Sequence, residues 1–552
     1  MRSFIIALTI IVISVTHVFA QQYRIEKSAG FEEPENGWNK VLQLRNGNTL
    51  FFHMENKVGF SIIAYDKTRK EIARKTITSQ LWDPRRLDEG AIAGLYDING
   101  EAVIFLTQID NNLKLSLYRL RISATTAEII KEDVAGSFAP VKDYKKSTVD
   151  LVYSKIYVEK DPASDCYAII YRKIPARPKD YLHVQHYNEK HEILTDADYC
   201  TISDSFSSLY YIGCIVDGDK RLFITTNMTI EKPGDTVSGF AVSCLRSGEK
   251  IFHHHVTAIK QEFSDVNGVM LYNHSTNTIQ LLTILLTKQS TKSNFLIDRS
   301  KTTSTYQTVL FYINPDDLNI SHTTVFNAEK VEEYIKNKID PDRSFHGLPQ
   351  QMIINKNNTT TIISEETRTQ SMTRNGALVR EDSYIGVTGI SQLSENGAEI
   401  SGFAFNKNQM TQGALQKFYI ADRAKGQYIP PPTYFGFSRT FYFRQFISAD
   451  YLFTPGGQYV LFNDLPVNYE KGEDEPKRKL LNSVTESNVI CCKLGDNKVE
   501  KFYLFGEPDK YRTIYCYITS SDFDRNNYTY ATLMVEHIGR KKEAKIAWVT
   551  FE

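Results

Sequence analysis

Two clusters of polar residues have types and spacings that could bind a metal ion. His253 and His255 would lie on one face of a strand, where two imidazoles can share a metal, but no third ligand follows nearby. We therefore interpret them as part of a half-exposed outer strand. Residues 522–527 have oxygen ligands at alternate positions, as at the start of a calcium loop. Position twelve of such a loop would be Leu533 instead of glutamate, so we predict a hairpin turn and no metal site.

The sequence lacks the motifs of the common catalytic and cofactor sites. It contains no Gly-x-Ser-x-Gly nucleophile elbow, no phosphate-binding loop and no sialidase Asp box. Three tryptophans are too few for the regular tryptophan in each blade of a quinoprotein. Acidic pairs such as Asp316-Asp317 occur, but glycosidase chemistry needs two carboxylates that meet across a bound sugar. We predict no cofactor, leave the catalytic residues unknown and favour a protein without enzymatic activity.

The densest unusual stretch runs from Tyr428 to Phe446 and combines eight aromatic residues with two arginines. Such a composition is typical of interface anchors and sugar-binding platforms. A polar Asn-Asp pair and a further asparagine follow shortly after it, where a strand passes into a loop. We predict one ligand-binding site that contains Tyr434, Arg439, Asn463, Asp464 and Asn468. The alternative is that the aromatic stretch packs against its own sheet.

An internal repeat supplies the elements that would position these residues. Each copy reads as two apolar strands joined by a polar turn, followed by a second hairpin, and in the first copy Asn46-Gly47 is the dipeptide preferred in tight hairpins. Apolar runs such as Ala102–Leu106 lack alternation, as in sheets covered on both faces. We predict an all-β fold, a β-propeller of seven or eight four-stranded blades. The first hairpins of the copies span residues 41–52, 92–109, 151–171, 210–226, 269–286, 352–364, 451–462 and 514–535.

The ends of the chain indicate how the ring closes. The last repeat offers only three strands, and Tyr23–Lys27 could supply a fourth. An open ring would expose sheet edges, so we predict that this mature N-terminal strand completes the C-terminal sheet. One short inserted helix is predicted over residues 327–339, with Asn327 as its cap. No linker divides the chain, so we predict a signal peptide over residues 1–20 and a single propeller domain over residues 21–552.

The first twenty residues have the three parts of a secretory signal. Arg2 precedes an apolar run, Phe4 to Val15, and Val18-Phe19-Ala20 suits a signal peptidase. The run is too short to span a bilayer stably, although an uncleaved anchor is the rival interpretation. No run of 18 apolar residues follows, so we expect no transmembrane segment in the mature chain. We expect export to the periplasm, the cell surface or the extracellular space.

Charge and cysteine content narrow the range of partners. The 65 basic residues equal the 65 acidic ones, so charge gives no argument for binding nucleic acid or an anionic membrane. The seven cysteines fit no zinc pattern and cannot all pair within the chain. Cys200 and Cys214 could form one local bridge, and we expect the others to be buried free thiols.

Residues 380–470 resemble a group of uncharacterised exported Bacteroidetes proteins. The resemblance rests on residues 384–400, on Asn406-Lys407-Asn408-Gln409, and on Phe462-Asn463-Asp464 followed by Asn468. In that group a strand pair ends in a Lys-x-Gln element, and a Phe-Asn-Asp-x-x-x-Asn segment follows. This chain departs from the pattern at Ser401-Gly402, where a tryptophan is common. The resemblance implies a propeller-like exported protein and transfers no activity.

The sequence favours a binding or scaffold protein of the bacterial periplasm or cell surface, whose partner is an unknown protein or glycan. Propellers present loops around a central channel on a rigid frame, so recognition is common in this fold. One alternative is a carbohydrate-active hydrolase with carboxylates at the channel mouth. Acids clustered on one axial face would favour hydrolysis, and a neutral aromatic face would favour binding. A second alternative is a structural component of the envelope.

Overall fold

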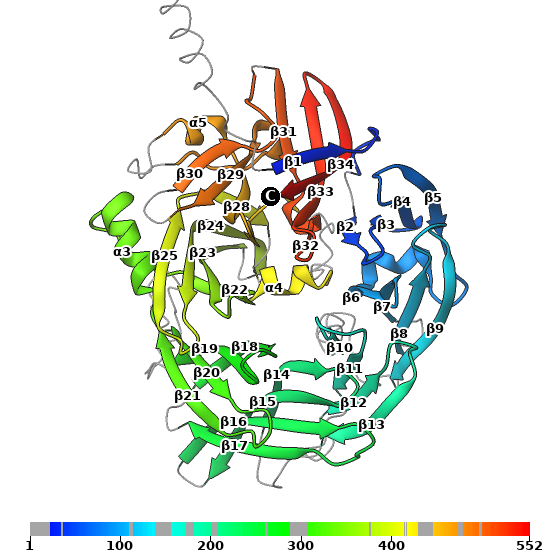
Figure 1. The fold of residues 1–552 in the computed structure, drawn as a ribbon, viewed down its shortest axis with the longest axis vertical. Coiled ribbons are helices and arrows are strands. Elements are labelled where there is room, and N and C mark those ends of the chain that lie inside the picture. Colours follow the sequence, from blue (N-terminus) through cyan, green and yellow to red (C-terminus); the bar gives the residue numbers. More distant parts are fainter. Residues whose placement is uncertain are drawn as a thin grey trace, which may run out of the picture.

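The computed structural model shows a ring of eight sheets around a central axis (Figure 1). In each of blades 1 to 7 the main strands are paired in chain order, and the first strand lies nearest the axis. This is the predicted all-β propeller, and the number of blades is eight. The structure describes residues 23–34, 37–109, 114–138, 156–172, 182–199, 208–232, 235–259, 263–287, 306–374, 377–412, 415, 417–428, 445–471, 478–495, 499–509 and 511–552.

The first four blades contain sixteen strands. They are β2 (Trp38–Gln43), β3 (Thr49–Glu55), β4 (Gly59–Tyr65) and β5 (Glu71–Ile77) in blade 1; β6 (Ala91–Ile98), β7 (Glu101–Ile109), β8 (Leu115–Ile122) and β9 (Ile129–Phe138) in blade 2; β10 (Ile156–Lys160), β11 (Tyr167–Arg172), β12 (Leu182–Tyr187) and β13 (Ile193–Tyr199) in blade 3; and β14 (Ser208–Asp217), β15 (Arg221–Lys232), β16 (Asp235–Arg246) and β17 (His253–Ile259) in blade 4.

The remaining strands form blades 5 to 8. They are β18 (Phe263–Asn273), β19 (Thr278–Thr287), β20 (Tyr306–Ile313) and β21 (Ile320–Phe326) in blade 5; β22 (Leu348–Ile354), β23 (Thr360–Arg374), β24 (Ala377–Leu393), β25 (Glu399–Phe405) and β26 (Gln409–Gln412) in blade 6; β27 (Asp450–Thr454), β28 (Gly457–Asp464), β29 (Asn488–Leu494) and β30 (Val499–Tyr503) in blade 7; and β31 (Arg512–Cys516), β32 (Asp522–Asp524), β33 (Thr529–Ile538), β34 (Lys541–Phe551) and β1 (Tyr23–Lys27) in blade 8.

Packing between neighbouring blades explains why the second strands lack alternation. Eight of the nine residues of β7 are buried, whereas five of the seven residues of the outer strand β5 are exposed. Leu50 and Phe52 of blade 1 belong to one apolar cluster with Ile104 and Leu106 of blade 2. Both faces of an inner sheet region are thus removed from water, which is the main stabilising contribution in such a ring.

The N-terminal strand closes the ring as predicted. β1 pairs antiparallel with β34 over five residue pairs, from Tyr23 opposite Phe551 to Lys27 opposite Ala547. Tyr23 also stacks on Phe502 of blade 7, with 5.4 Å between ring centroids. The outer edge of the last sheet is therefore covered by the start of the described chain (Figure 1).

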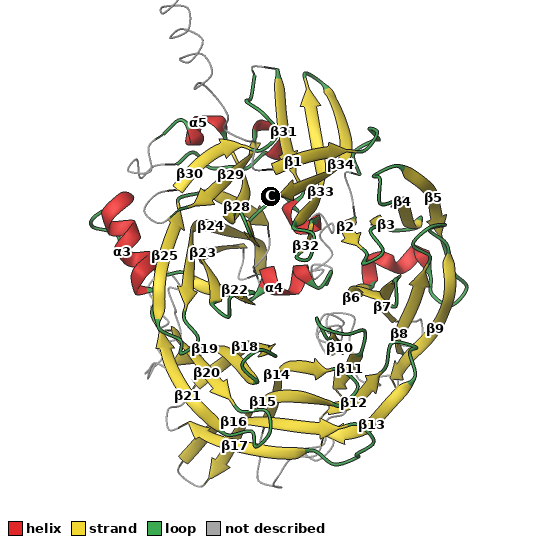
Figure 2. Cartoon of the chain, in the orientation of Figure 1, coloured by secondary structure: helices red, strands yellow, loops and turns green. Residues whose placement is uncertain are grey.

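Helix is scarce, and Figure 2 shows its few segments in red. The predicted inserted helix is α3 (Glu329–Lys338), which packs its buried Val331 against β25. A Cβ on Gly402 would lie 2.3 Å from Val331 N, so glycine permits this close approach. The predicted cap was wrong: Ala328 in a left-handed conformation begins the helix, and no side chain caps it. Two short helices escaped prediction, α4 (Tyr419–Ala424) and α5 (Pro466–Tyr469).

The residues considered for metal binding have structural roles in the described chain. His253 lies on the outermost strand of blade 4 and contacts Glu249, with 3.0 Å between Nε2 and Oε2. Asp524 accepts from the backbone of Asn526 (2.8 Å), as the predicted turn requires. No cluster of three His, Cys, Asp or Glu residues able to hold a metal occurs within the described ranges.

The six described cysteines are free and buried. Cys214 of the predicted bridge is one of them, and Cys200 lies outside the described residues. None of the helices in the described ranges is long and apolar enough to cross a membrane.

Candidate functional site

A connecting segment between blades 6 and 7 enters the centre of the ring. It contains α4 and the residues up to Tyr428, and we call residues 419–428 the axial segment. Figure 1 shows α4 beside the axis. Ile92 of blade 2 and Tyr428 exchange two backbone hydrogen bonds, of 2.8 and 2.9 Å. Lys40 of blade 1 donates to Arg423 O (3.2 Å), so blades 1 and 2 hold a segment that leaves from blade 6.

A buried ion pair anchors the start of the axial segment. Glu365 of β23 pairs with Lys407, and both side chains are fully buried. Tyr419 donates to Glu365 Oε2, and Ser448 and Thr388 each donate to Oε1 over 3.0 Å. Burial alone would raise the pKa of Glu365, but Lys407 and the hydroxyl donors hold that pKa below its usual value. Four donors on two oxygens leave little capacity for a ligand, so this carboxylate serves to anchor α4.

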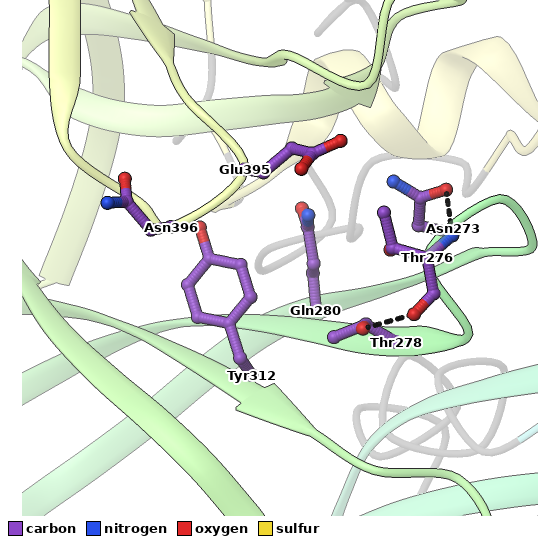
Figure 3. A pocket seen from close by; sticks show the side chains of 7 residues that line it. All are labelled: Asn273, Thr276, Thr278, Gln280, Tyr312, Glu395 and Asn396. Atoms are coloured by element: carbon purple, nitrogen blue, oxygen red, sulfur yellow. Dashed lines mark hydrogen bonds between the residues drawn. The ribbon is translucent and has the colours of Figure 1, made fainter.

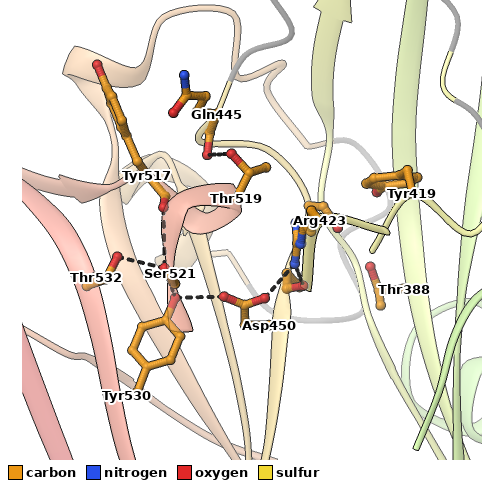
Figure 4. Close-up of polar contacts among 12 residues, drawn as sticks. Thr388, Tyr419, Arg423, Gln445, Asp450, Tyr517, Thr519, Ser521, Tyr530 and Thr532 are labelled. Atoms are coloured by element: carbon orange, nitrogen blue, oxygen red, sulfur yellow. Dashed lines mark hydrogen bonds and ion pairs between the residues drawn. The ribbon is translucent and has the colours of Figure 1, made fainter. Parts of the chain in front are cut away.

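A second polar network connects the axial segment to blades 7 and 8 (Figure 4). Arg423 donates from Nη2 to Asp450 Oδ1 (2.5 Å) and to Ala449 O (2.6 Å). Tyr530 donates to Asp450 Oδ2 (2.7 Å), and Ser521 Oγ lies 2.7 Å from the same hydroxyl. These partners come from different blades, and together they fix the orientation of α4.

Around the end of α4 the polar side chains are partly buried. Lys425 Nζ lies 2.8 Å from Glu159 Oε1 of β10, and the two side chains are 30 % and 13 % exposed. Asp422 is half-buried, and no side chain or amide in the described ranges donates to its carboxylate. Burial raises the pKa of Asp422 to about 6, Glu159 adds to this rise, and Lys425 opposes it. Asp422 therefore lies in an environment, shared with Glu159, that favours its protonated form.

Three tyrosines from the inner strands of blades 2, 3 and 4 lie around Glu159. Tyr157 and Tyr211 stack, with ring centroids 4.1 Å apart. Tyr96 donates to Val158 O (2.6 Å), whereas the buried hydroxyl of Tyr211 has no partner. Burial is the main cause of a raised pKa at both Tyr96 and Tyr211, and the negative charge of Glu159 adds to it.

Irregularities in the inner strands orient these tyrosines. In β14 the register shifts between Tyr211 and Gly213, so one extra residue puts Tyr211 and Cys214 on the same face. In β6 a Cβ on Gly94 would lie 2.3 Å from the Tyr96 ring, so glycine leaves room for that ring along the strand. Each strand has its bulge directly before a glycine, Gly213 in β14 and Gly94 in β6, where the register shifts between Ile92 and Gly94.

The resulting group, which we call the axial cluster, can stack on a ligand and exchange hydrogen bonds with it. The tyrosines offer aromatic faces, and Tyr211 offers an unpaired hydroxyl. Burial raises the pKa of Asp422 to about 6, so it can hold or release a proton near that pH. The axial cluster consists of Tyr96, Tyr157, Glu159, Tyr211, Asp422 and Lys425.

Three of the predicted site residues lie together and are buried. Asn463 is 0 % exposed; its amide donates to Phe446 O and Cys516 O, both over 2.8 Å. Asp464, 2 % exposed, accepts from Asn468 Nδ2 (2.7 Å) at the start of α5. Burial raises the pKa of Asp464 to about 6, while Asn468 opposes this rise. The contacts of this group within the described chain join blades 7 and 8 and hold the loop after β28.

Tyr434 and Arg439 lie outside the described residues, so the predicted five-residue site stays a prediction. Sequence reasoning missed the axial cluster because its members come from four separate chain segments without a motif. The usable signal was weak: Asp422 and Lys425 lie in a connection between repeats, just before the aromatic stretch that was singled out.

Comparison with known proteins supports no family assignment. No protein-family profile and no curated protein matches the chain. Among solved structures, the WD40 domain of SCAP from fission yeast aligns over 97 % of this chain and 96 % of its own, with 7 % identity and a TM-score of 0.34. A quinohemoprotein alcohol dehydrogenase from Pseudomonas putida aligns over 93 % and 76 %, with 8 % identity and a TM-score of 0.34.

A third similar structure is a glycosidase. An alpha-L-arabinofuranosidase from Lactobacillus brevis covers 50 % of this chain and 91 % of its own, with 12 % identity and a TM-score of 0.22. At these scores the likenesses carry no statement about activity.

Proposed function

We propose that this chain is an exported binding protein of the bacterial periplasm or cell surface whose axial cluster takes a sugar unit of a glycan. The observation that carries the proposal is the pair of unsatisfied polar groups among tyrosines at the ring axis. Tyr211 has a buried hydroxyl without a partner, and Asp422 has a carboxylate to which nothing described donates. A hydroxyl-rich ligand supplies partners for both groups, and sugar rings pack well on tyrosine faces.

Charge narrows the ligand class. Lys425 is already paired with Glu159 at 2.8 Å, so Asp422 contributes the net charge of the cluster. The carboxylate of Asp422 would repel an acidic sugar, because the axial cluster has no free cation to offset the two negative charges. Neutral and amino sugars carry no negative charge and avoid this repulsion. Export is supported by the signal-like first twenty residues.

Binding of a panel of neutral, amino and acidic oligosaccharides to the full mature chain tests the proposal by calorimetry. We expect one group of neutral or amino sugars to bind, and Tyr211→Phe and Asp422→Asn each to weaken binding about fivefold or more, the value of one or two lost hydrogen bonds. The control is Tyr65→Phe, which also removes a buried hydroxyl without a partner, but in the apolar cluster between blades 1 and 8. Binding that is unchanged in both axial variants would show that the site is elsewhere.

A second candidate function is glycoside hydrolysis at the same cluster. The observation that favours it is a pair of carboxylates with different partners: Asp422, whose pKa burial raises to about 6, and Glu159, which forms an ion pair with Lys425. Asp422 would protonate the leaving oxygen, and the carboxylate of Glu159 would act from the other side. Release of new reducing ends from a bound oligosaccharide, lost in Asp422→Asn, would establish this function. Binding without such release would limit the protein to recognition.

A further inference from the structure

A separate pocket of about 240 Å³ lies between blades 5 and 6, away from the axial cluster (Figure 3). Its floor comes from the β18–β19 hairpin and from β20 of blade 5, and its rim comes from the β24–β25 turn of blade 6. The volume lies below the 300 to 1,000 Å³ that is usual for drug-sized ligands, so a small ligand would fit. The lining residues are Asn273, Thr276, Thr278, Gln280, Tyr312, Glu395 and Asn396.

The floor of the pocket contains an unsatisfied polar group. Tyr312 is only 4 % exposed, and its hydroxyl is buried without a hydrogen-bond partner. Figure 3 shows this hydroxyl directed toward the rim at Asn396. Burial raises the pKa of Tyr312 to about 12, so the hydroxyl keeps its proton and can donate. Glycine at position 397 permits the close approach of the rim to this hydroxyl, because a Cβ there would lie 2.8 Å from the oxygen.

Two amide side chains lie beside Tyr312; the oxygen of each already accepts a hydrogen bond, and the nitrogen of each is still available as a donor. Gln280 Oε1 accepts from Thr360 (2.9 Å), and Asn273 Oδ1 accepts from the backbone of Ser275 (3.0 Å). Within the described ranges nothing accepts from Gln280 Nε2 or Asn273 Nδ2. Both residues are almost fully buried, at 2 % and 4 % exposure, so their rotamers are fixed by packing. The floor therefore presents donors in fixed positions.

The rim presents the complementary kind of group. Glu395 is exposed on the β24–β25 turn, and its carboxylate has no partner among the described residues. Asn396 Oδ1 accepts from Ser394 Oγ (2.5 Å), which leaves its amide nitrogen as a donor. A ligand in this pocket would meet donors below it and one carboxylate above it.

We propose that this pocket is a second binding site, for a single neutral sugar or a similar small polyol. Such a ligand carries acceptors and donors on every side, so it can accept from Tyr312 and the two amides and donate two hydroxyls to Glu395. An anion would face Glu395 without a cation in the lining, and an apolar ligand would leave the Tyr312 hydroxyl unpaired. The site is independent of the function proposed for the axial cluster, since no residue belongs to both.

Titration of the full mature chain with methyl glycosides of common neutral hexoses tests this proposal, with saturation-transfer NMR and calorimetry as readouts. In a chain that carries Asp422→Asn and Tyr211→Phe, which together weaken binding at the axial cluster, we expect binding of at least one glycoside to persist with unchanged affinity. Tyr312→Phe should weaken that binding about fivefold and Glu395→Gln about tenfold, consistent with loss of a neutral and a charge-assisted hydrogen bond.

The matched control is Tyr272→Phe. Tyr272 lies on the same hairpin and donates to Asn277 (2.7 Å), but it does not line the pocket, so binding should stay unchanged. Tyr312→Phe removes only an unpaired hydroxyl from the core, so its melting temperature should equal or exceed that of the wild type. The proposal is overturned if no glycoside binds the axial double variant, or if Tyr312→Phe and Glu395→Gln bind as tightly as Tyr272→Phe.

Discussion

Replacing Lys407 with methionine should destabilise the ring by about 3–5 kcal/mol, the usual cost of leaving a buried charge without its partner. Glu365 is fully buried with Lys407 as its ion-pair partner; the other groups that bind it, Tyr419, Ser448 and Thr388, are neutral hydroxyl donors. Removal of the ammonium would keep these hydroxyls but leave the carboxylate uncompensated. Glu365→Gln should cost a similar amount, because Lys407 would then be the unpaired charge.

The double variant distinguishes this explanation from a general loss of packing. With glutamine at 365 and methionine at 407 this pair carries no charge; the amide oxygen can accept from Ser448 and Thr388, and the amide nitrogen can donate to the Tyr419 hydroxyl. Such neutral replacements of buried pairs are often harmless, so the double variant should lie within about 1 kcal/mol of the wild type. The coupling free energy in the cycle would then exceed about 3 kcal/mol.

Urea unfolding at pH 7, followed by the fluorescence of the buried Trp38, Trp82 and Trp548, measures these changes as shifts of the midpoint. The pH dependence gives a second check. Because the pKa of Glu365 is lowered in the folded chain, its contribution is complete above the unfolded value, about 4.3, and is lost as pH falls through the folded value. Additive costs in the double variant would refute the reasoning, since they would mean that the two side chains stabilise the ring independently.

Two further predictions concern the closure of the ring and the axial cluster. Deleting residues 21–30 should lower the melting temperature by several degrees, because β34 loses its partner strand and Phe502 loses its stacked tyrosine; an unchanged melting curve in a fluorescence assay would contradict this role of β1. Asp422→Asn should raise the melting temperature at pH 8 but not at pH 3, because the rise of the Asp422 pKa from 3.8 to about 6 on folding makes this carboxyl group oppose folding increasingly between those two pH values. An equal effect at both pH values would show that charge is not the cause.

The fold could be predicted from the sequence because each blade is built from the same hairpins, whose strands pair over short sequence distances. Asn46-Gly47 predicts a tight turn, and Gly47 indeed has a positive φ of 89° between β2 and β3. The eight first hairpins all correspond to blades, since short-range pairing decides each of them. The position of the N-terminal strand could be inferred only from the number of strands in each repeat, because the last repeat offered three instead of four.

The parts that escaped prediction depend on contacts between distant segments. α4 has six residues, too few for a helical period to be recognised, and it is held by Glu365 and Asp450 from two other segments. The helix at α3 was found, but its cap was not, because Ala328 starts it through backbone conformation instead of a side chain. Glu159 and Lys425 are 266 residues apart in sequence, so no spacing could have indicated their ion pair.

Two carboxylates, Glu365 at the start of the axial segment and Asp422 within it, show where the fold alone explains a residue and where it does not. Glu365 has four donors, so its burial is compensated and its pKa falls; Asp422 has none in the described ranges, and its pKa rises to about 6. An asparagine at 422 would avoid the cost of that burial, and a phenylalanine would do the same for the unpaired hydroxyl of Tyr211. Folding therefore gives no reason for either residue, whereas a ligand that restores their hydrogen bonds does. If both replacements stabilise the chain and both weaken sugar binding, stability and function are opposed at the ring axis. Such opposition is expected of a binding site and not of residues whose only role is to pack the centre of the ring.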